Sequence, residues 1–277
     1  MLTPIRGFAA LSGAARVALA VLAAIAIVAA FAPLVAPYDP AAQPDIVGAK
    51  NLPPSAQHPF GTDPYSRDVL SRVIYGARLS LAIGFLATMV SLTLGVAYGA
   101  VAGYAGGFVD ALMMRILDAL LAIPRLLLLI AILAAWTRLS VGALVLFLGL
   151  TGWFGLSRIV RGQVLALTEA EFITSARALG ASRRRILARH LLPNLISPIA
   201  VAATLGVAHV IVLEVGLSYL GIGVAQPEAS WGNIIHDGSD QVATLWWMSL
   251  FPGLLMVLTV MMLNIVGESL RDAYDRR

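Results

Sequence analysis

Residues 168–194 read TEAEFITSARALGASRRRILARHLLPN and form a basic segment between very apolar stretches. With the ten residues before it, this segment carries seven arginines against two glutamates, a net charge of +5. Glu, Ala, Arg and Leu favour helix, so 169–179 is predicted to be helical. Gly180 can end that helix in a left-handed conformation, Ser182 can cap a second helix, and Pro193 can stop it. The segment therefore predicts two short helices joined at a glycine.

The composition around this segment is that of a membrane protein. Hydrophobic residues make up 59% of the 277 positions and charged residues 12%, against about 25% charged in a typical soluble domain. Too few polar side chains exist to cover a water-exposed surface, so lipid must solvate much of the chain. The chain has no cysteine, which excludes disulfides, and its four histidines lack metal-ligand spacing.

Apolar runs of about 20 residues, enough to cross a bilayer, predict six spanning helices. Their approximate ranges are 17–36, 77–104, 113–136, 141–160, 195–222 and 245–270. A cleaved signal peptide is the alternative for the first range, although its apolar run is longer than a usual signal core. Pro124 falls inside the third span, where neighbouring helices can satisfy the freed carbonyl.

A polar, proline-rich stretch at 37–75 separates the first two spans. Within it, the apolar face of 66–75 predicts a helix lying on the outer membrane surface. A contact site for a partner outside the membrane is the alternative interpretation of that helix. We divide the chain into 1–76, with the first span and this stretch, and 77–277, a core of five spans that includes the loop 161–194.

The arginines predict the orientation, because cytoplasmic loops carry an excess of positive charge. With the ten residues before it, the basic segment has a net charge of +5, and the last residues of the sequence include Arg271, Arg276 and Arg277. The stretch 37–75 has a net charge of −1, and the loop after the fifth span carries three acids and no base. Both termini and the basic segment are therefore predicted to be cytoplasmic.

The first helix of the basic segment carries an apolar stripe. Phe172, Ala176 and Leu179 fall at helical spacing on one face. Two interpretations fit: a basic loop that packs against lipid headgroups, or a rigid coupling helix that inserts into a groove of a soluble partner.

The basic segment resembles the cytoplasmic signature loop of ABC-transporter permease subunits. That pattern is Glu-Ala-Ala, three residues, Gly, nine residues, Ile, one residue, Leu-Pro. The matching positions here are Thr174-Ser175-Ala176, Gly180, His190 and Leu192-Pro193. Thr174 replaces the glutamate and His190 the isoleucine. Five further stretches resemble permeases of the dipeptide, oligopeptide and nickel importer family, namely 58–81, 103–124, 214–223, 227–235 and 264–275.

The resemblance implies an all-α, multi-pass protein of the bacterial inner membrane, with the type I ABC importer permease fold and a cytoplasmic coupling helix. It implies a homologous second permease, two ATP-binding cassette ATPases and an extracytoplasmic substrate-binding protein as partners, in addition to membrane lipids. No nucleic-acid partner is expected. The expected ATPase-docking residues are Glu171, Phe172, Thr174, Ser175, Ala176, Leu179, Gly180 and Pro193.

The chain is not expected to be an enzyme or to hold a cofactor. Its only lysine, Lys50, lacks the glycine-rich lead of a P-loop, so ATP and Mg are expected in the partner ATPases. The resemblance implies di- or oligopeptides as cargo, with nickel or another small solute as the alternative. A stand-alone channel or ion-driven carrier is a further alternative.

Charged residues within the predicted spans are candidates for the substrate pathway. Glu214 lies deep in the fifth span, and His209 lies five residues earlier, where it can share a polar network with Glu214. Arg115 and Asp118 are spaced for an ion pair within one helix. Arg125 follows Pro124 and either reaches the membrane surface or faces a polar cavity.

Overall fold

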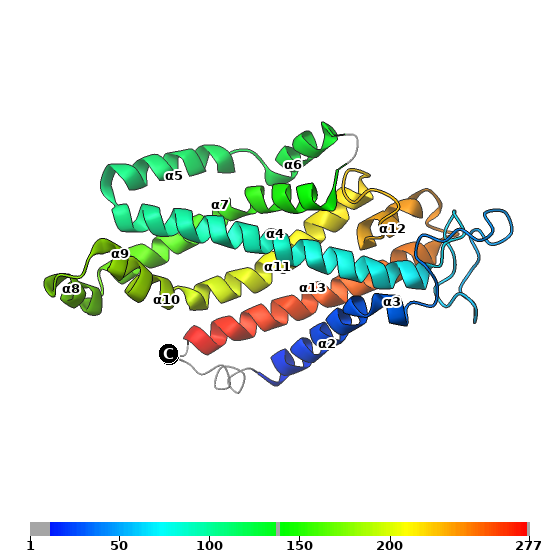
Figure 1. The fold of residues 1–277 in the computed structure, drawn as a ribbon, viewed down its shortest axis with the longest axis horizontal. Helices are drawn as coiled ribbons and strands as arrows, with labels where there is room; N and C mark the ends of the chain where they lie inside the picture. Colours follow the sequence, from blue (N-terminus) through cyan, green and yellow to red (C-terminus); the bar gives the residue numbers. More distant parts are fainter. Residues whose placement is uncertain (1–11, 137–138, 276–277) are drawn as a thin grey trace.

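The structure is a computed structural model that describes residues 12–136 and 139–275. Arg276 and Arg277, which contributed to the predicted orientation, lie outside the described residues. The regular elements of the described chain are helices (Figure 1). In chain order they are α2 (Gly13–Ala30), α3 (Ala32–Val35), α4 (Val69–Ala105), α5 (Gly107–Leu121), α6 (Arg125–Ala134), α7 (Val141–Thr168), α8 (Glu171–Ala178), α9 (Arg183–Ile186), the π-helix η1 (Leu187–Leu191), α10 (Leu192–Asn194), α11 (Ile196–Tyr219), α12 (Trp231–Asp237), the 3-10 helix η2 (Ser239–Gln241) and α13 (Trp246–Asp275).

Within the described residues, five helices are long and apolar enough to cross a membrane, namely α2, α4, α7, α11 and α13. The helices α5 and α6 pass the same test as a pair, bent by 70° at the short break between them. The expectation that Pro124 lies inside one continuous helix of the third span is therefore wrong. Pro124 is instead the residue before α6, because proline lacks an N–H and keeps the residue before it out of helical conformation.

The helix α4 is longer than predicted at its start. Its carboxylate cap, Asp68, accepts a hydrogen bond from the Ser71 backbone N–H at 2.8 Å. The predicted surface helix at 66–75 is wrong, because Val69 and Val73 are buried in a core with α12 and α13. The first turns of α4 are thus part of the packed bundle.

The helix α7 continues eight residues past its predicted end. Two of the seven arginines, Arg158 and Arg161, consequently lie on a helix that faces α5 and not in a loop. Arg158 pairs with Asp118, so the predicted pair of Asp118 with Arg115 is not the one that forms. Arg161 pairs with Asp110, with Nη2 and Oδ2 2.5 Å apart. The pairs hold α5 against α7.

The helices α4 and α7 pack closely against each other, and glycine makes this possible. A Cβ on Gly99 would lie 2.4 Å from the Ser157 carbonyl oxygen, and one on Gly103 would lie 2.9 Å from the Arg161 carbonyl oxygen. Small residues four positions apart let membrane helices approach closely, and van der Waals packing then stabilises the pair.

The start of α2 lies beside the last turns of α13. The Ser12 backbone N–H donates to Ser269 Oγ at 3.2 Å. Figure 1 shows the end of α13 on the same side as α8 and α9, and the stretch between α3 and α4 at the opposite side. We call these sides the loop end and the opposite end.

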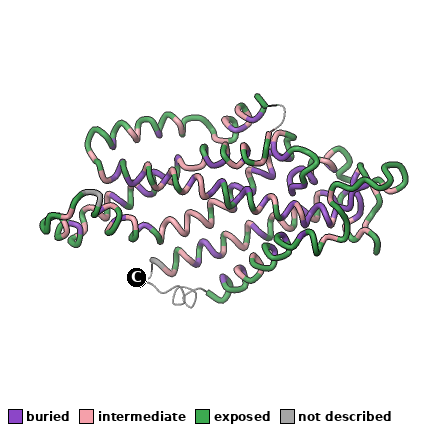
Figure 2. The backbone as a smooth tube through the Cα atoms, in the orientation of Figure 1, coloured by how far each residue is buried: buried purple, intermediate pink, exposed green. Residues whose placement is uncertain are grey.

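The outer surface of the bundle is apolar. Figure 2 shows exposed residues along α2, α5 and α6, with buried residues concentrated on α4, α7 and α12. On α5 the exposed side chains include Phe108, at 80%, and Leu112, at 50%. Large apolar side chains with no protein cover need lipid as their solvent, as the composition predicted.

Candidate functional site

The two-helix loop forms as predicted, with a shift of two residues at its start. The first helix is α8, and Glu171 is the acid in its first turn. Glu169, which was predicted to share that turn, instead ends α7. The Ser182 hydroxyl accepts from the Arg185 backbone N–H at 3.4 Å, which confirms the predicted cap of the second helix.

Gly180 ends α8 with φ +77°. The Ala181 N–H donates to the Ala176 carbonyl at 3.0 Å, and the Gly180 N–H donates to the Arg177 carbonyl at 2.9 Å. This pair of hydrogen bonds defines a Schellman motif, in which a left-handed residue satisfies the last carbonyls of a helix. Apart from its two chain neighbours, no atom of the described residues lies within 4 Å of a Cβ built on Gly180, so the backbone conformation, and not space, requires glycine there.

The two faces of α8 differ sharply in burial. Ile173 is fully buried in a core with α7 and η1. On the predicted apolar stripe, Leu179 is 88% exposed, Phe172 is 43% exposed and Ala176 is partly buried. Ile173 therefore anchors α8 to the bundle, and the stripe is left uncovered at the loop end.

The second helix does not stop at Pro193, contrary to the prediction. The segments α9, η1 and α10 follow one another directly, and Leu195 leads into α11. The Asn194 side-chain amide donates to the His190 carbonyl at 2.6 Å, which satisfies a carbonyl in the π-helical turn before the proline. The loop is thereby joined to α11 through helical backbone.

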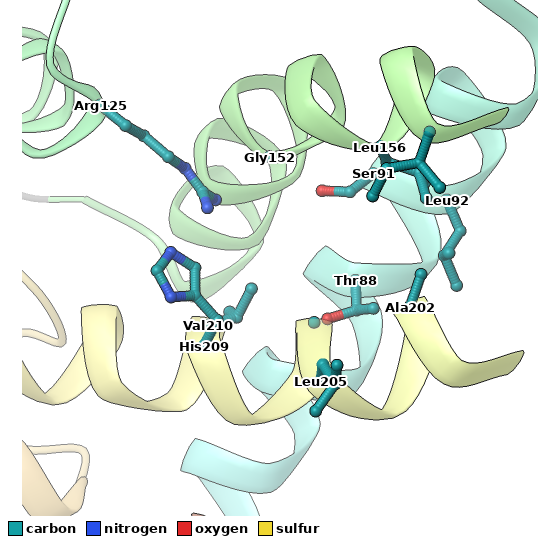
Figure 3. Close-up of a pocket in the computed structure, with 12 residues that line it drawn as sticks. Thr88, Ser91, Leu92, Arg125, Gly152, Leu156, Ala202, Leu205, His209 and Val210 are labelled. Carbon is teal, nitrogen blue, oxygen red and sulfur yellow. The ribbon is translucent and has the colours of Figure 1, made fainter. Parts of the chain in front are cut away.

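A pocket opens between α4, α6, α7 and α11 in the middle of the bundle, with a volume of about 390 Å³. Its polar lining residues are Thr88, Ser91, Arg125 and His209, and the remaining lining residues are apolar or glycine. Figure 3 shows Arg125 reaching in from α6 toward Gly152, and the His209 ring rising toward Arg125 from α11. Of the two predicted interpretations of Arg125, the structure supports the polar cavity.

The bend of the backbone before α6 directs the Arg125 side chain into this pocket. The bend between α5 and α6 places Arg125 at the first position of α6, beside α7. Its Nη2 donates to the Leu148 carbonyl at 2.8 Å, and its Nε donates to Thr151 Oγ1 at 3.3 Å. The guanidinium is thus held at two of its five N–H groups.

Glu214 lies outside this pocket, in the contact between α4, α11 and α12. The carboxylate is fully buried and accepts from the hydroxyls of Ser80 and Ser218, each at 2.8 Å. The structure therefore places His209 and Glu214 in different environments and does not bring them into one network.

Sequence reasoning missed Thr88, Ser91 and Gly152 as pocket residues. Single serines, threonines and glycines in apolar spans usually serve helix packing, so no local signal distinguished these three. Their convergence depends on which faces of α4 and α7 meet.

Comparisons with known proteins agree with this architecture. The family described as "Binding-protein-dependent transport system inner membrane component" matches residues 91–277. The chain belongs to this family. A second family, described as the N-terminal TM domain of oligopeptide transport permease C, matches residues 12–54 of the permease.

Curated relatives match most of the permease. The dipeptide transport system permease protein DppC of Bacillus subtilis (strain 168) is 43% identical over 227 residues, covering 82% of this chain and 71% of the relative. The oligopeptide transport system permease protein OppC of the same organism is 39% identical over 261 residues, covering 94% of this chain and 85% of the relative.

A solved structure shares the fold of the permease. The MetNI methionine ABC transporter in an inward-facing conformation aligns with a TM-score of 0.60 at 19% identity, over 73% of this chain and 96% of that chain. The permease is thus an all-helical, multi-pass inner-membrane component with an ABC importer permease fold. It is a non-catalytic subunit, and ATP binding belongs to a partner ATPase.

Proposed function

We propose that this permease forms half of the translocation pathway of an ATP-driven importer of di- and oligopeptides. The main support is the similarity to dipeptide and oligopeptide transport permeases, which extends over most of both chains. The second half of the pathway comes from a homologous permease. Two ATPases supply the energy, and an extracytoplasmic binding protein delivers the peptide.

The proposed topology has six spans, with the bent pair α5 and α6 as one of them. Both termini and the loop end lie in the cytoplasm. The contact of Ser12 with Ser269 at the loop end supports a common side for the termini. The arginines of the basic segment support its cytoplasmic side, although Arg158 and Arg161 are paired with α5.

The proposed docking element is α8 with its glycine cap. Its uncovered stripe, Phe172, Ala176 and Leu179, enters a groove of one ATPase, a mode in which an amphipathic helix lays its apolar face into a partner. The polar docking residues Glu171, Thr174 and Ser175 are exposed beside it, and Gly180 and Pro193 are also exposed. Because helical backbone joins the loop to α11, movement of the docked α8 reaches the pocket-lining helix.

The mechanism that we propose is alternating access. Binding of ATP closes the two ATPases and displaces α8. The resulting tilt of α11 and α7 opens the pocket alternately to one side of the membrane and to the other. His209 lies on the pathway at the pocket. Glu214, buried between helices, maintains their packing and does not contact cargo.

Nickel fits this pathway less well than peptide does. Among the described residues, no group of three histidine or acidic side chains is arranged to hold a metal ion. The charged group in the pocket is the cation Arg125, which repels a divalent cation at short range.

Reconstituted vesicles test the proposal. The complete complex should take up radiolabelled di- or tripeptide only with ATP and the loaded binding protein. Leu179→Asp should abolish ATPase co-purification and uptake, since a charge cannot enter an apolar groove. Val47→Asp, at a side chain 85% exposed on the opposite end, is the matched control and should retain both. Peptide uptake without ATP, or full coupling in Leu179→Asp, would contradict the proposal.

A further inference from the structure

The pocket holds a cation without a counter-ion. Of the described residues that line it, none is aspartate or glutamate. Across the described chain, no carboxylate forms an ion pair with Arg125, whereas the buried Arg67 and Arg72 are both paired. A charge at membrane depth is costly, and an unpaired one marks a substrate or ion pathway more often than a packing role.

Two contacts fix the direction of the guanidinium and leave most of it free. The Leu148 carbonyl and the Thr151 hydroxyl occupy Nη2 and Nε. The donors that remain include both N–H groups of Nη1, which no described residue accepts. Three free donors in one plane suit a carboxylate, since arginine binds carboxylates through two parallel hydrogen bonds.

Gly152 lets the Arg125 and Ser91 side chains lie close to the backbone of α7. A Cβ at this position would lie 2.9 Å from Arg125 Nη2 and 2.3 Å from Ser91 Oγ. The absence of a side chain on α7 therefore allows Arg125 and Ser91 to line one cavity from two sides (Figure 3). A larger residue at this position would displace the Arg125 and Ser91 side chains from the pocket wall.

The surrounding groups extend the polar end of the pocket. His209 points toward Arg125 (Figure 3), and its ring forms no hydrogen bond with the described residues, so an N–H donor is available. Beyond these two groups the lining is apolar and includes Leu92, Leu156 and Leu205. The volume of about 390 Å³ falls within the ~300–1,000 Å³ that small-ligand pockets typically have.

From this geometry we propose that Arg125 and His209 bind the C-terminal carboxylate of a peptide during its passage, with the last side chain against the leucines. This proposal rests on the proposed function and adds a chemical selectivity within the membrane. Two of its lining residues, Ile159 and Leu205, are exposed, so the site opens to the surface of the bundle. This suits weak, transient binding, because cargo must leave as readily as it enters. Packing of an acidic residue of the second permease against Arg125 is the competing source of a carboxylate.

A matched pair of peptides tests the site. The complete complex is reconstituted in vesicles, and a tripeptide with a free C-terminus and its C-terminally amidated form are each presented on saturated binding protein. The ratio of their uptake rates is compared between the wild type and Arg125→Gln, which removes the charge. Arg125→Lys keeps the charge without the planar pair of donors. Arg115→Gln, at an exposed arginine on α5, is the control for loss of one charge.

We expect the wild type to favour the free carboxylate, and Arg125→Gln to lose that preference by about tenfold, the change that 1.4 kcal/mol produces. Arg125→Lys should recover part of it, and Arg115→Gln should behave as the wild type. An unchanged ratio in Arg125→Gln, with peptide uptake intact, overturns the carboxylate site alone. Loss of the second permease from purified Arg125→Gln complexes also overturns it, since the counter-ion then belongs to that subunit. Absence of wild-type uptake of both peptides contradicts the proposed function itself.

Discussion

Arg72 Nη1 lies 2.9 Å from Asp237 Oδ2, although 165 positions separate the two residues in the sequence. Arg67 contacts the same carboxylate at 2.8 Å, and both arginines also pair with Asp63 at 2.5 Å. All four side chains are nearly or fully buried. Two positive and two negative charges thus compensate one another and tie the start of α4 to α12 at the opposite end.

We predict that Asp63→Asn strongly destabilises the protein. The substitution leaves two buried arginines with one carboxylate, and removing one partner of a buried ion pair typically costs about 3–5 kcal/mol. The measurement is the midpoint of thermal unfolding of the purified complex. Asp39→Asn, at an exposed aspartate of the same stretch, should leave the midpoint unchanged. Equal midpoints for both variants would show that the cluster contributes little.

Gly99→Ala should separate α4 from α7. The new Cβ would meet the Ser157 carbonyl oxygen at 2.4 Å, and overpacking of this kind costs about 1–3 kcal/mol. Gly155→Ala makes the same change on α7, where a Cβ meets nothing within 4 Å. The thermal midpoint should fall for Gly99→Ala only. A fall of the same size in Gly155→Ala would mean that close approach is not the cause.

Substitutions at Gly180 should act through the backbone, because its built Cβ touches nothing. Gly180→Val forces a β-branched residue to φ +77°, a strain of about 1–3 kcal/mol. Gly180→Asn should retain most uptake, since asparagine tolerates the left-handed region. Gly180→Pro should abolish uptake while the chain still inserts, because proline cannot adopt this φ and lacks the N–H that bonds Arg177. Vesicle uptake and quantification of membrane-inserted chain provide the measurement, and normal transport by Gly180→Pro would refute the docking role.

Glu214→Gln should preserve uptake. An amide has one acceptor and one donor group for the hydroxyls of Ser80 and Ser218, which can rotate to match. Glu214→Ala should lower the thermal midpoint, since it leaves two buried hydroxyls without that partner, at about 1–3 kcal/mol each. Uptake and unfolding are measured on the same preparations. Loss of uptake by a stable Glu214→Gln complex would show that Glu214 has a role in the substrate pathway.

The helices of the basic segment show which structural features local sequence patterns can predict and which they cannot. Propensity, the glycine and Ser182 predicted both helices of the basic segment and their joint, because caps and left-handed residues act within a few positions. The same reasoning failed at Pro193, where a π-helical turn and the Asn194 side chain let the helical path continue. It also ended α7 too early, since the partners of Arg158 and Arg161 lie on α5, far away in the sequence.

The amino-acid sequence alone therefore determined the spanning helices, the joint at Gly180 and the predicted orientation. Each of these depends on transfer of side chains to lipid, on the distribution of arginines or on local backbone conformation. The bend at Pro124, the burial of Glu214 away from His209 and the pocket around Arg125 were decided only in the tertiary structure. Each of these depends on which helix faces meet. Contacts of this kind join residues 23 to 165 positions apart, so no local periodicity of the sequence predicts them.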